Sequence, residues 1–163
     1  MTIKDAIAAC QASGLTGWDL ASHTQALVCA QMTYSYDNSF DFPLRAFARG
    51  KGYCWQQAGA LNLILRGLGF ESRLVHAMRN RFPDVVRGGK LVHIGVSGHA
   101  WCRVTIDGVE KDLCPGNPAN RPGVIHFEPL SAVRNYSGPI VVFGYLGSAW
   151  INWKRGRRFR FMN

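Results

Sequence analysis

The sequence has no hydrophobic run long enough to span a membrane and no pair of cysteines in a C-x-x-C arrangement. A spanning helix needs about 18 or more apolar residues in a row, and the first residues, MTIKDAIAACQ, lack the charged-then-apolar order of a signal peptide. The five cysteines are an odd number without metal-type spacing, which argues against a disulfide framework and against a zinc site. We therefore expect a cytoplasmic protein that has no membrane contact, no metal and no other cofactor.

Acidic residues are also scarce, since 10 Asp and Glu stand against 19 Lys and Arg and give a formal net charge of +9. Five of the cations fall in one short stretch: Lys154, Arg155, Arg157, Arg158 and Arg160. Such a surplus favours acidic partners without identifying any. With 47% hydrophobic and 12% aromatic residues among 163, the chain is predicted to form one globular domain over residues 1–163.

No internal repeat or low-complexity linker divides the chain, so its helices are predicted from the spacing of apolar residues. Helices are expected at residues 3–12 and 19–33. The clearest helix follows Cys54, where Ala58, Leu61, Leu65 and Leu68 recur at helical spacing.

Strand-like segments dominate the second half of the chain. Strands are expected at residues 71–78 and 91–96, with a polar loop at 79–90 between them. The dipeptide Asp107-Gly108 favours a two-residue hairpin that joins strands at 99–106 and 109–114. Further strands are expected within residues 139–161. Helices followed by an antiparallel sheet indicate an α+β domain.

Cys54 is the candidate nucleophile, because it stands at the first turn of the clearest helix, after the glycines of GKGYC. The positive end of the helix dipole favours the thiolate, the form that attacks carbonyl carbons. Gly50 and Gly52 leave room for a backbone turn and for an approaching substrate. The competing interpretation is that Cys54 is a small buried hydrophobe, the commonest role of a free cysteine.

His99 is the candidate base. It follows the Ser97-Gly98 break and leads directly into the hairpin strand, a setting that the other four histidines lack. Trp101 lies two residues further along, so strand alternation puts it on the face of His99, where it can pack against the imidazole. A thiol and an adjacent imidazole are the nucleophile and the general base of a thiol catalyst.

Three motifs in this order resemble the transglutaminase-like superfamily of papain-fold thiol enzymes: G-x-G-x-C before an apolar helix, LRGLGFESRLV, and HAW-x-x-V-x-x-DG. The similarity covers about residues 19–116 and includes the upstream helix ending in Tyr34-Ser35-Tyr36. The resemblance implies a Cys-His-Asp triad, with the helix that carries Cys54 packed on an antiparallel sheet that carries the other two members.

The third member of the triad departs from the family pattern. The family's acid usually precedes a proline, but here Cys114 precedes the proline and Asp112 lies two residues earlier. The hairpin register opposes Asp112 to Arg103, so Asp112 either approaches His99 through a bulge or pairs with Arg103. Asp112 is the preferred orienter and Asn117 is an amide alternative, whereas Cys114 is disfavoured because a thiol accepts an imidazole N–H poorly.

The implied chemistry is acyl transfer from an amide through a thioester on Cys54, with His99 protonating the departing ammonia or amine. Water then gives deamidation or peptide cleavage, and a lysine amine gives a crosslink. One oxyanion donor is expected to be the backbone N–H of Cys54. Candidates for the second donor are Gln31, Trp18 and Tyr36.

The loop at residues 79–90 bears on the substrate, because it carries four cations against the single acid Asp84 and is expected to border the cleft. This balance favours an acidic peptide or protein amide as acyl donor and repels a protonated lysine amine. Hydrolysis, by an amidase, deamidase or peptidase, is therefore preferred to transglutaminase crosslinking.

Two other functions compete with this one. An arylamine acetyltransferase has a related triad, but the chain is short and the extension that builds a coenzyme A site is not evident in it. A nucleic-acid-binding module would use the aromatic residues Trp150, Trp153, Phe159 and Phe161 among the five cations. An edge hairpin kept soluble by its cations explains the same segment and is favoured over nucleic-acid binding.

Overall fold

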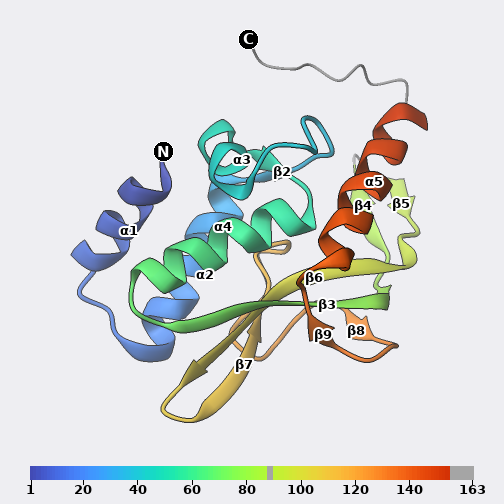
Figure 1. Ribbon diagram of the computed structural model, residues 1–163. Coiled ribbons are helices and arrows are strands. Elements are labelled where there is room, and N and C mark those ends of the chain that lie inside the picture. Colours follow the sequence, from blue (N-terminus) through green and yellow to red (C-terminus); the bar gives the residue numbers. More distant parts are fainter. Residues whose placement is uncertain (88–89, 155–163) are drawn as a thin grey trace.

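The computed structural model describes residues 1–87 and 90–154 (Figure 1). The helices are α1 (Ile3–Ala12), α2 (Gly17–Gln31), α3 (Pro43–Arg49), α4 (Cys54–Gly67) and α5 (Pro139–Lys154). The strands are β1 (Thr33–Tyr34), β2 (Lys51–Gly52), β3 (Glu71–Phe82), β4 (Val85–Arg87), β5 (Lys90–Val92), β6 (Gly95–Ile106), β7 (Val109–Leu113), β8 (Glu128–Pro129) and β9 (Arg134–Asn135).

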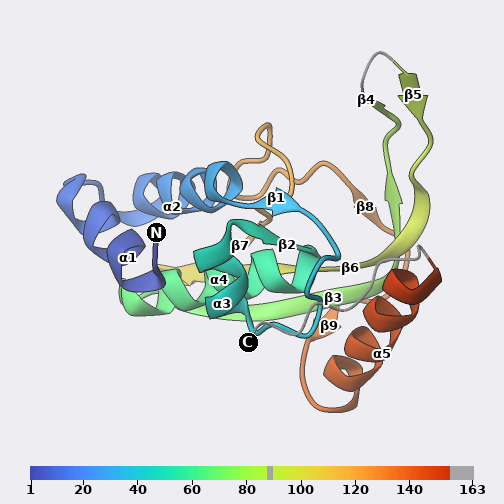
Figure 2. The same ribbon diagram turned by 90° about the horizontal axis from the view of Figure 1, so that it is seen from above.

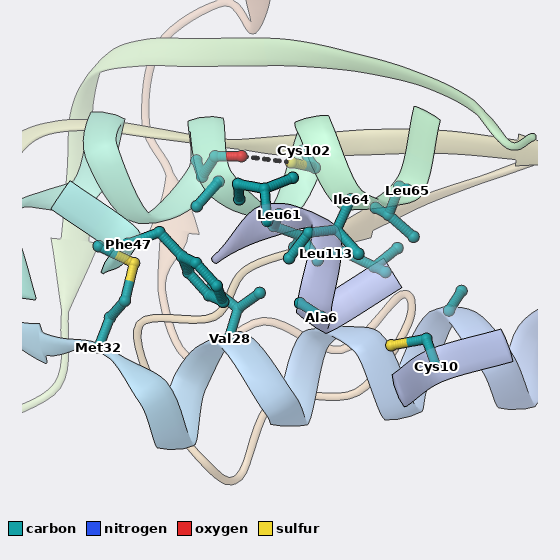
Figure 3. Close-up of a cluster of buried hydrophobic side chains, with 14 of the residues drawn as sticks. Ala6, Cys10, Val28, Met32, Phe47, Leu61, Ile64, Leu65, Cys102 and Leu113 are labelled. Atoms are coloured by element: carbon teal, nitrogen blue, oxygen red, sulfur yellow. Dashed lines mark hydrogen bonds between the residues drawn. The ribbon is translucent and has the colours of Figure 1, made fainter. Parts of the chain in front are cut away.

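Helix α4 lies at the centre of the fold. It packs on β3 and β6, while α1, α2 and α3 pack around it (Figures 1 and 2). Its fully buried Leu61, Ile64 and Leu65 meet Phe47 of α3 and Val28 of α2 in one cluster (Figure 3). Burial of these apolar side chains is the main force that holds α4 on the sheet. The α+β arrangement predicted from the sequence is confirmed.

The main sheet has the order β7-β6-β3-β8, with β9 also paired to β3, and its pairs are antiparallel. The predicted register of the β6–β7 hairpin is confirmed, since Arg103 opposes Asp112 and Ile106 opposes Val109. Asp107 and Gly108 both have positive φ, as a two-residue hairpin turn requires.

A bulge bends β3 where it passes His99. Between the pairs Ala77–His99 and Asn80–Ser97, β3 has two residues and β6 has one. The buried side-chain amide of Asn80 donates to the carbonyls of Ala77 (2.8 Å) and Ser97 (3.1 Å), so the bulge is held by hydrogen bonds. Bulges of this kind re-aim the side chains next to them.

Three expectations about local structure are corrected, the first of them only in the bounds of a helix that is present. Helix α2 begins and ends two residues earlier than residues 19–33. The expected polar loop at 79–90 begins with the last part of β3, and a short β4–β5 hairpin follows, because β3 continues its pairing with β6 past the bulge (Figure 2).

The third correction concerns the strands expected within residues 139–161, where the structure has helix α5. Pro139 is the first residue of the helix, a position that suits its fixed φ. Val141, Val142 and Phe143 suggested a strand, but such propensities are weak where packing decides. The predicted segment continues into residues 155–161, which lie outside the described residues, as do most of the cations of the nucleic-acid alternative.

No helix in the described part of the chain is long and apolar enough to cross a membrane. Within residues 1–87 and 90–154, no group of three His, Cys, Asp or Glu side chains is placed to hold a metal ion.

Candidate active site

The two glycines before Cys54 have different structural roles. Gly50 ends α3 with a left-handed φ of 75°, so it provides the predicted turn. At Gly52, an added Cβ would lie 2.8 Å from Cβ of Gln56 and 2.9 Å from Cε of Met32. Gly52 is therefore required by close packing, whereas the sequence had suggested room for a substrate.

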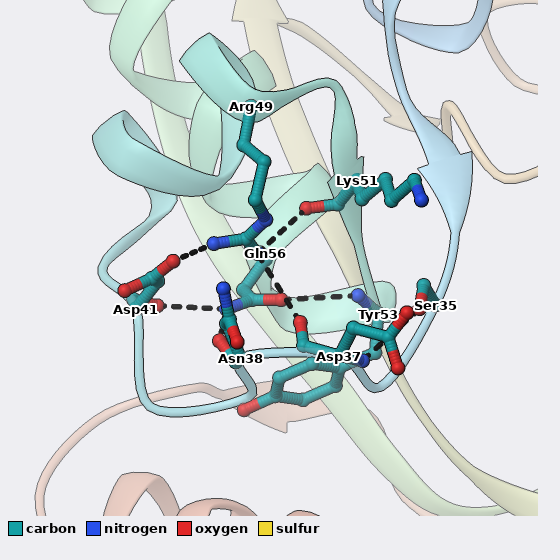
Figure 4. Close-up of polar contacts among 8 residues, drawn as sticks. All are labelled: Ser35, Asp37, Asn38, Asp41, Arg49, Lys51, Tyr53 and Gln56. Carbon is teal, nitrogen blue, oxygen red and sulfur yellow. Dashed lines mark hydrogen bonds and ion pairs between the residues drawn. The ribbon is translucent and has the colours of Figure 1, made fainter. Parts of the chain in front are cut away.

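A set of polar contacts fixes the segment that leads into Cys54 (Figure 4). Arg49 forms an ion pair with Asp41 and donates to the carbonyl of Lys51 at 3.1 Å. Gln56 donates to the carbonyl of Asp41 at 2.8 Å, and its side-chain oxygen accepts from the N–H of Tyr53 at 3.2 Å. These bonds hold the first turn of α4, and with it the position of Cys54, against the loop before α3.

Cys54 is the first residue of α4 and is half-buried. Burial raises the pKa of its thiol, while the backbone N–H groups of Ala100, Trp55 and Cys54 itself act in the opposite direction. The helix dipole had favoured a thiolate, but desolvation of the sulfur outweighs it. The resting side chain is a neutral thiol that faces backbone N–H groups.

His99 lies in an aromatic enclosure. Its ring centroid is 5.2 Å from that of Phe82, 4.6 Å from that of Phe127 and 6.1 Å from that of Trp101, which shares its face as predicted. Burial, and secondarily the charge of a protonated His126, lowers the pKa of His99 to about 3. The imidazole is therefore neutral at neutral pH.

The partner of His99 is Cys114. Nε2 of His99 lies 3.3 Å from Sγ of Cys114, the residue directly before Pro115. Asp112 instead forms a bidentate ion pair with Arg103, at 2.8 Å and 3.0 Å. The structure thus places Asp112 beside Arg103 and not beside His99, and the side chain in contact with His99 is the thiol that the sequence had disfavoured.

The loop after β7 supports this contact without Asn117. The side-chain oxygen of Asn117 accepts from the N–H of Ala119 at 2.8 Å and so shapes its own turn. Asn120 is buried, donates to the carbonyl of Cys114 at 2.8 Å and lies 3.0 Å from Nδ1 of His126. Asn120 and His126 were missed in the sequence because they lie in an irregular segment with no periodicity.

Cys54 and His99 line one cavity of about 220 Å³, and helix α5 supplies part of its wall. Of the three candidates for a second oxyanion donor, Tyr36 lines this cavity. Gln31 donates to the carbonyl of Phe47 at 3.4 Å, and Trp18 lies under the ammonium of Lys111. The backbone N–H of Ala100, which faces the Cys54 sulfur, is a donor that no side-chain motif could reveal.

A comparison with protein-family profiles identifies the family of this chain. The profile of the transglutaminase-like superfamily matches residues 5–110, more than half of the chain. A crystal structure from Parabacteroides distasonis ATCC 8503, described as a "putative protease", is similar with a TM-score of 0.47 and 14% sequence identity. The match covers 83% of this chain and 26% of that one, so this chain spans about a quarter of its length. No curated protein matches the chain.

Proposed function

Since the chain belongs to the transglutaminase-like superfamily, we propose that it catalyses acyl transfer from an amide through a thioester on Cys54. The observation that carries this proposal is that Cys54, at the start of α4, and His99, on β6, both line one cavity. A thiol and an imidazole from separate elements beside a cavity satisfy the first requirement of nucleophilic catalysis.

The reaction begins from uncharged groups. As the Cys54 sulfur attacks the amide carbonyl, its proton passes to His99, and the oxyanion that forms is stabilised by nearby backbone N–H groups such as those of Cys54 and Ala100. His99 then gives the proton to the departing amine as the C–N bond breaks. Water attacks the thioester, passes a proton through His99 to the sulfur, and releases the acid.

Cys114 acts as the positioning residue for His99. Its sulfur contacts Nε2, so Nδ1 is the ring nitrogen that would exchange protons with Cys54 in the proposed reaction. A thiol holds the ring but, unlike a carboxylate, adds little stabilisation to an imidazolium. We therefore expect a slower catalyst than a site with an acid at this position.

Water is the proposed acyl acceptor, which makes the protein an amidase, deamidase or peptidase. The net charge of +9 disfavours the approach of a protonated lysine amine, although a neutral acceptor is not repelled. Cys54 and His99 are neutral at rest, so the binding of a substrate does not have to remove an ion pair from water.

The test uses glutamine-containing peptides with and without a primary amine, and reads the products by mass. Deamidated or cleaved peptide should appear with the wild-type chain and disappear with Cys54→Ala. Cys29→Ala is the matched control, because Cys29 is also half-buried but lies on α2 away from the cavity lining. A dominant amine adduct would contradict the preference for water, and full activity of Cys54→Ala would contradict the proposed nucleophile.

A further inference from the structure

We infer that the cavity beside Cys54 binds an uncharged, largely apolar acyl group, in place of the acidic donor expected from the sequence. This inference rests on the proposed function, since it specifies the substrate of the same site. It follows from the chemistry of the residues that line the cavity and from the way the thioester is attached.

Helix α5 supplies one apolar wall. Ile140, Gly144, Gly147 and Ile151 line the cavity and recur at helical spacing, so one face of the helix is turned toward Cys54. On the opposite face of α5, the side chain of Leu146 is 60% exposed. The helix is thus apolar on two faces, and the inner face is the one that meets the reaction centre.

Aromatic side chains form the wall nearest the nucleophile. Tyr36 stacks on Tyr53 with ring centroids 5.5 Å apart, and both line the cavity together with Trp55. Tyr53 and Trp55 are almost fully buried, so their conformations are fixed by packing. Flat aromatic walls fit aromatic or branched acyl groups, which gain from contact area without needing a charge.

No residue that lines this cavity, in the described part of the chain, is Asp, Glu, Lys or Arg. The one imidazole in this lining besides that of His99 is the ring of His76, which is buried and whose pKa is lowered by burial, so it is neutral. A carboxylate inside would lose its hydration shell without meeting a cation in exchange. Arg81, from the loop that was expected to attract an acidic donor, instead pairs with Glu128 at 3.1 Å and does not line the cavity.

His76 also provides a polar contact for the occupant. Its Nδ1 is buried and has no hydrogen-bond partner among the described residues. Since burial lowers the pKa of the ring, the imidazole is neutral, and Nδ1 is free to form one hydrogen bond with an occupant. One hydroxyl or amide N–H on an otherwise apolar acyl group would satisfy it.

The acyl part of the substrate, and not the leaving group, is assigned to this cavity. The acyl carbon is bonded to the Cys54 sulfur in the thioester, so its substituent stays beside Cys54 through both steps. The amine must leave between the steps and water must enter. An apolar enclosure favours the group that stays, and an open side favours the groups that exchange.

The experiment compares p-nitrophenyl esters that share a leaving group and differ in the acyl part: acetyl, phenylacetyl, 4-hydroxyphenylacetyl and glutaryl. Nitrophenol release is measured at pH 7.5 and divided by the alkaline hydrolysis rate of each ester, and the acyl adduct on Cys54 is located by peptide mass. The two phenylacetyl esters should acylate Cys54 at least about 10-fold faster than the glutaryl ester.

Gly147→Leu is the matched perturbation, because no atom lies within 4 Å of an added Cβ and the new side chain extends the cavity wall. It should slow acylation by the phenylacetyl ester and leave the acetyl ester nearly unchanged. Leu146→Phe adds similar bulk to the outer face of α5 and should change neither rate.

The outcomes distinguish a failure of the apolar assignment from a failure of the proposed nucleophile. If the glutaryl ester acylates Cys54 as fast as or faster than the phenylacetyl esters, the apolar assignment is overturned while the nucleophile stands. Equal slowing of the acetyl and phenylacetyl esters by Gly147→Leu would likewise overturn it. If no ester leaves an adduct on Cys54 of the folded protein, both the proposed function and the inference fail.

Discussion

Replacement of Cys114 by aspartate should raise the rate of the reaction proposed at Cys54. The carboxylate oxygen of Cys114→Asp would lie near the present Sγ, which is 3.3 Å from Nε2 of His99. The backbone N–H of Gly116, which now faces the Cys114 sulfur, would give the carboxylate a second hydrogen bond. An acid would then stand before the proline, as in the family that the sequence resembles.

The magnitude follows from the pKa of His99, which is about 3 in the present site. An adjacent opposite charge raises an imidazole pKa by about 1 to 3 units, so proton transfer from Cys54 to His99 becomes easier by about 10-fold to 1000-fold. The rate of iodoacetamide alkylation of Cys54 at pH 7, and kcat/KM for an amide substrate, should rise by up to that factor. Cys114→Ser keeps a neutral hydrogen-bonding group and should stay close to wild type.

Alkylation is assigned to Cys54 by peptide mapping, because four other cysteines are present. Circular dichroism and thermal unfolding establish that each variant is folded. If folded Cys114→Asp is no faster than Cys114→Ser in both assays, the contact between position 114 and His99 does not control the proton transfer, and the assignment of Cys114 as positioning residue is refuted.

Four further outcomes are expected. Asp112→Asn and Arg103→Gln should each lower the free energy of unfolding and leave turnover near normal, because the two side chains pair with each other. A double-mutant cycle should give a coupling of about 1 kcal/mol. Independent effects on stability, or lost turnover in Asp112→Asn, would instead support Asp112 as a member of the triad. Gly52→Ala should destabilise the fold by about 1 to 3 kcal/mol in urea unfolding, since the methyl group has no space; unchanged stability would show that the segment can shift. The alkylation rate of Cys54 should rise with pH along a curve whose midpoint lies above that of a free cysteine, because burial raises its pKa; a midpoint on the acidic side would contradict the neutral thiol. The contribution of His99 to the free energy of unfolding should be fully present above pH 6.5 and should fall as the pH drops toward 3, by up to about 1.4 kcal/mol per pH unit, because only the unfolded state binds that proton. His99→Gln should flatten this slope in urea unfolding. An unchanged slope would contradict the burial of a neutral imidazole.

The elements that the sequence predicted well are those in which local and tertiary preferences agree. In α4, Ala58, Leu61 and Leu65 recur at helical spacing, and all three are fully buried against the sheet and the other helices. In the β6–β7 hairpin, the Asp-Gly turn determines the register by itself, so the opposition of Arg103 and Asp112 could be counted from the turn. The positions of Cys54 and His99 follow from these two elements.

The remaining features depend on contacts between distant segments. The sequence of α5 lacks the alternation of apolar and polar faces that predicts a helix, because α5 is apolar both toward the cavity and toward the outside. The enclosure of His99 by Phe82 and Phe127 brings together the end of β3 and an irregular loop, which no local pattern encodes. The pKa values of Cys54 and His99 depend on that burial, so their direction could not be derived from a helix dipole alone.

The absence of charge links the reacting groups to the proposed substrate. Cys54, His99 and Cys114 are all uncharged at neutral pH, since burial raises the thiol pKa values and lowers that of the imidazole. In a poorly hydrated site the charges formed during the reaction, an oxyanion and an imidazolium, interact strongly with fixed N–H dipoles and with each other. Water in the cavity would weaken these interactions, so an apolar acyl group that fills the space beside α5 would promote the chemistry as well as the binding. An anionic acyl group would instead bring water with it and oppose the oxyanion. The lack of charge that keeps Cys54 a neutral thiol at rest would therefore also favour, in the proposed reaction, a substrate whose apolar acyl group fills the cavity.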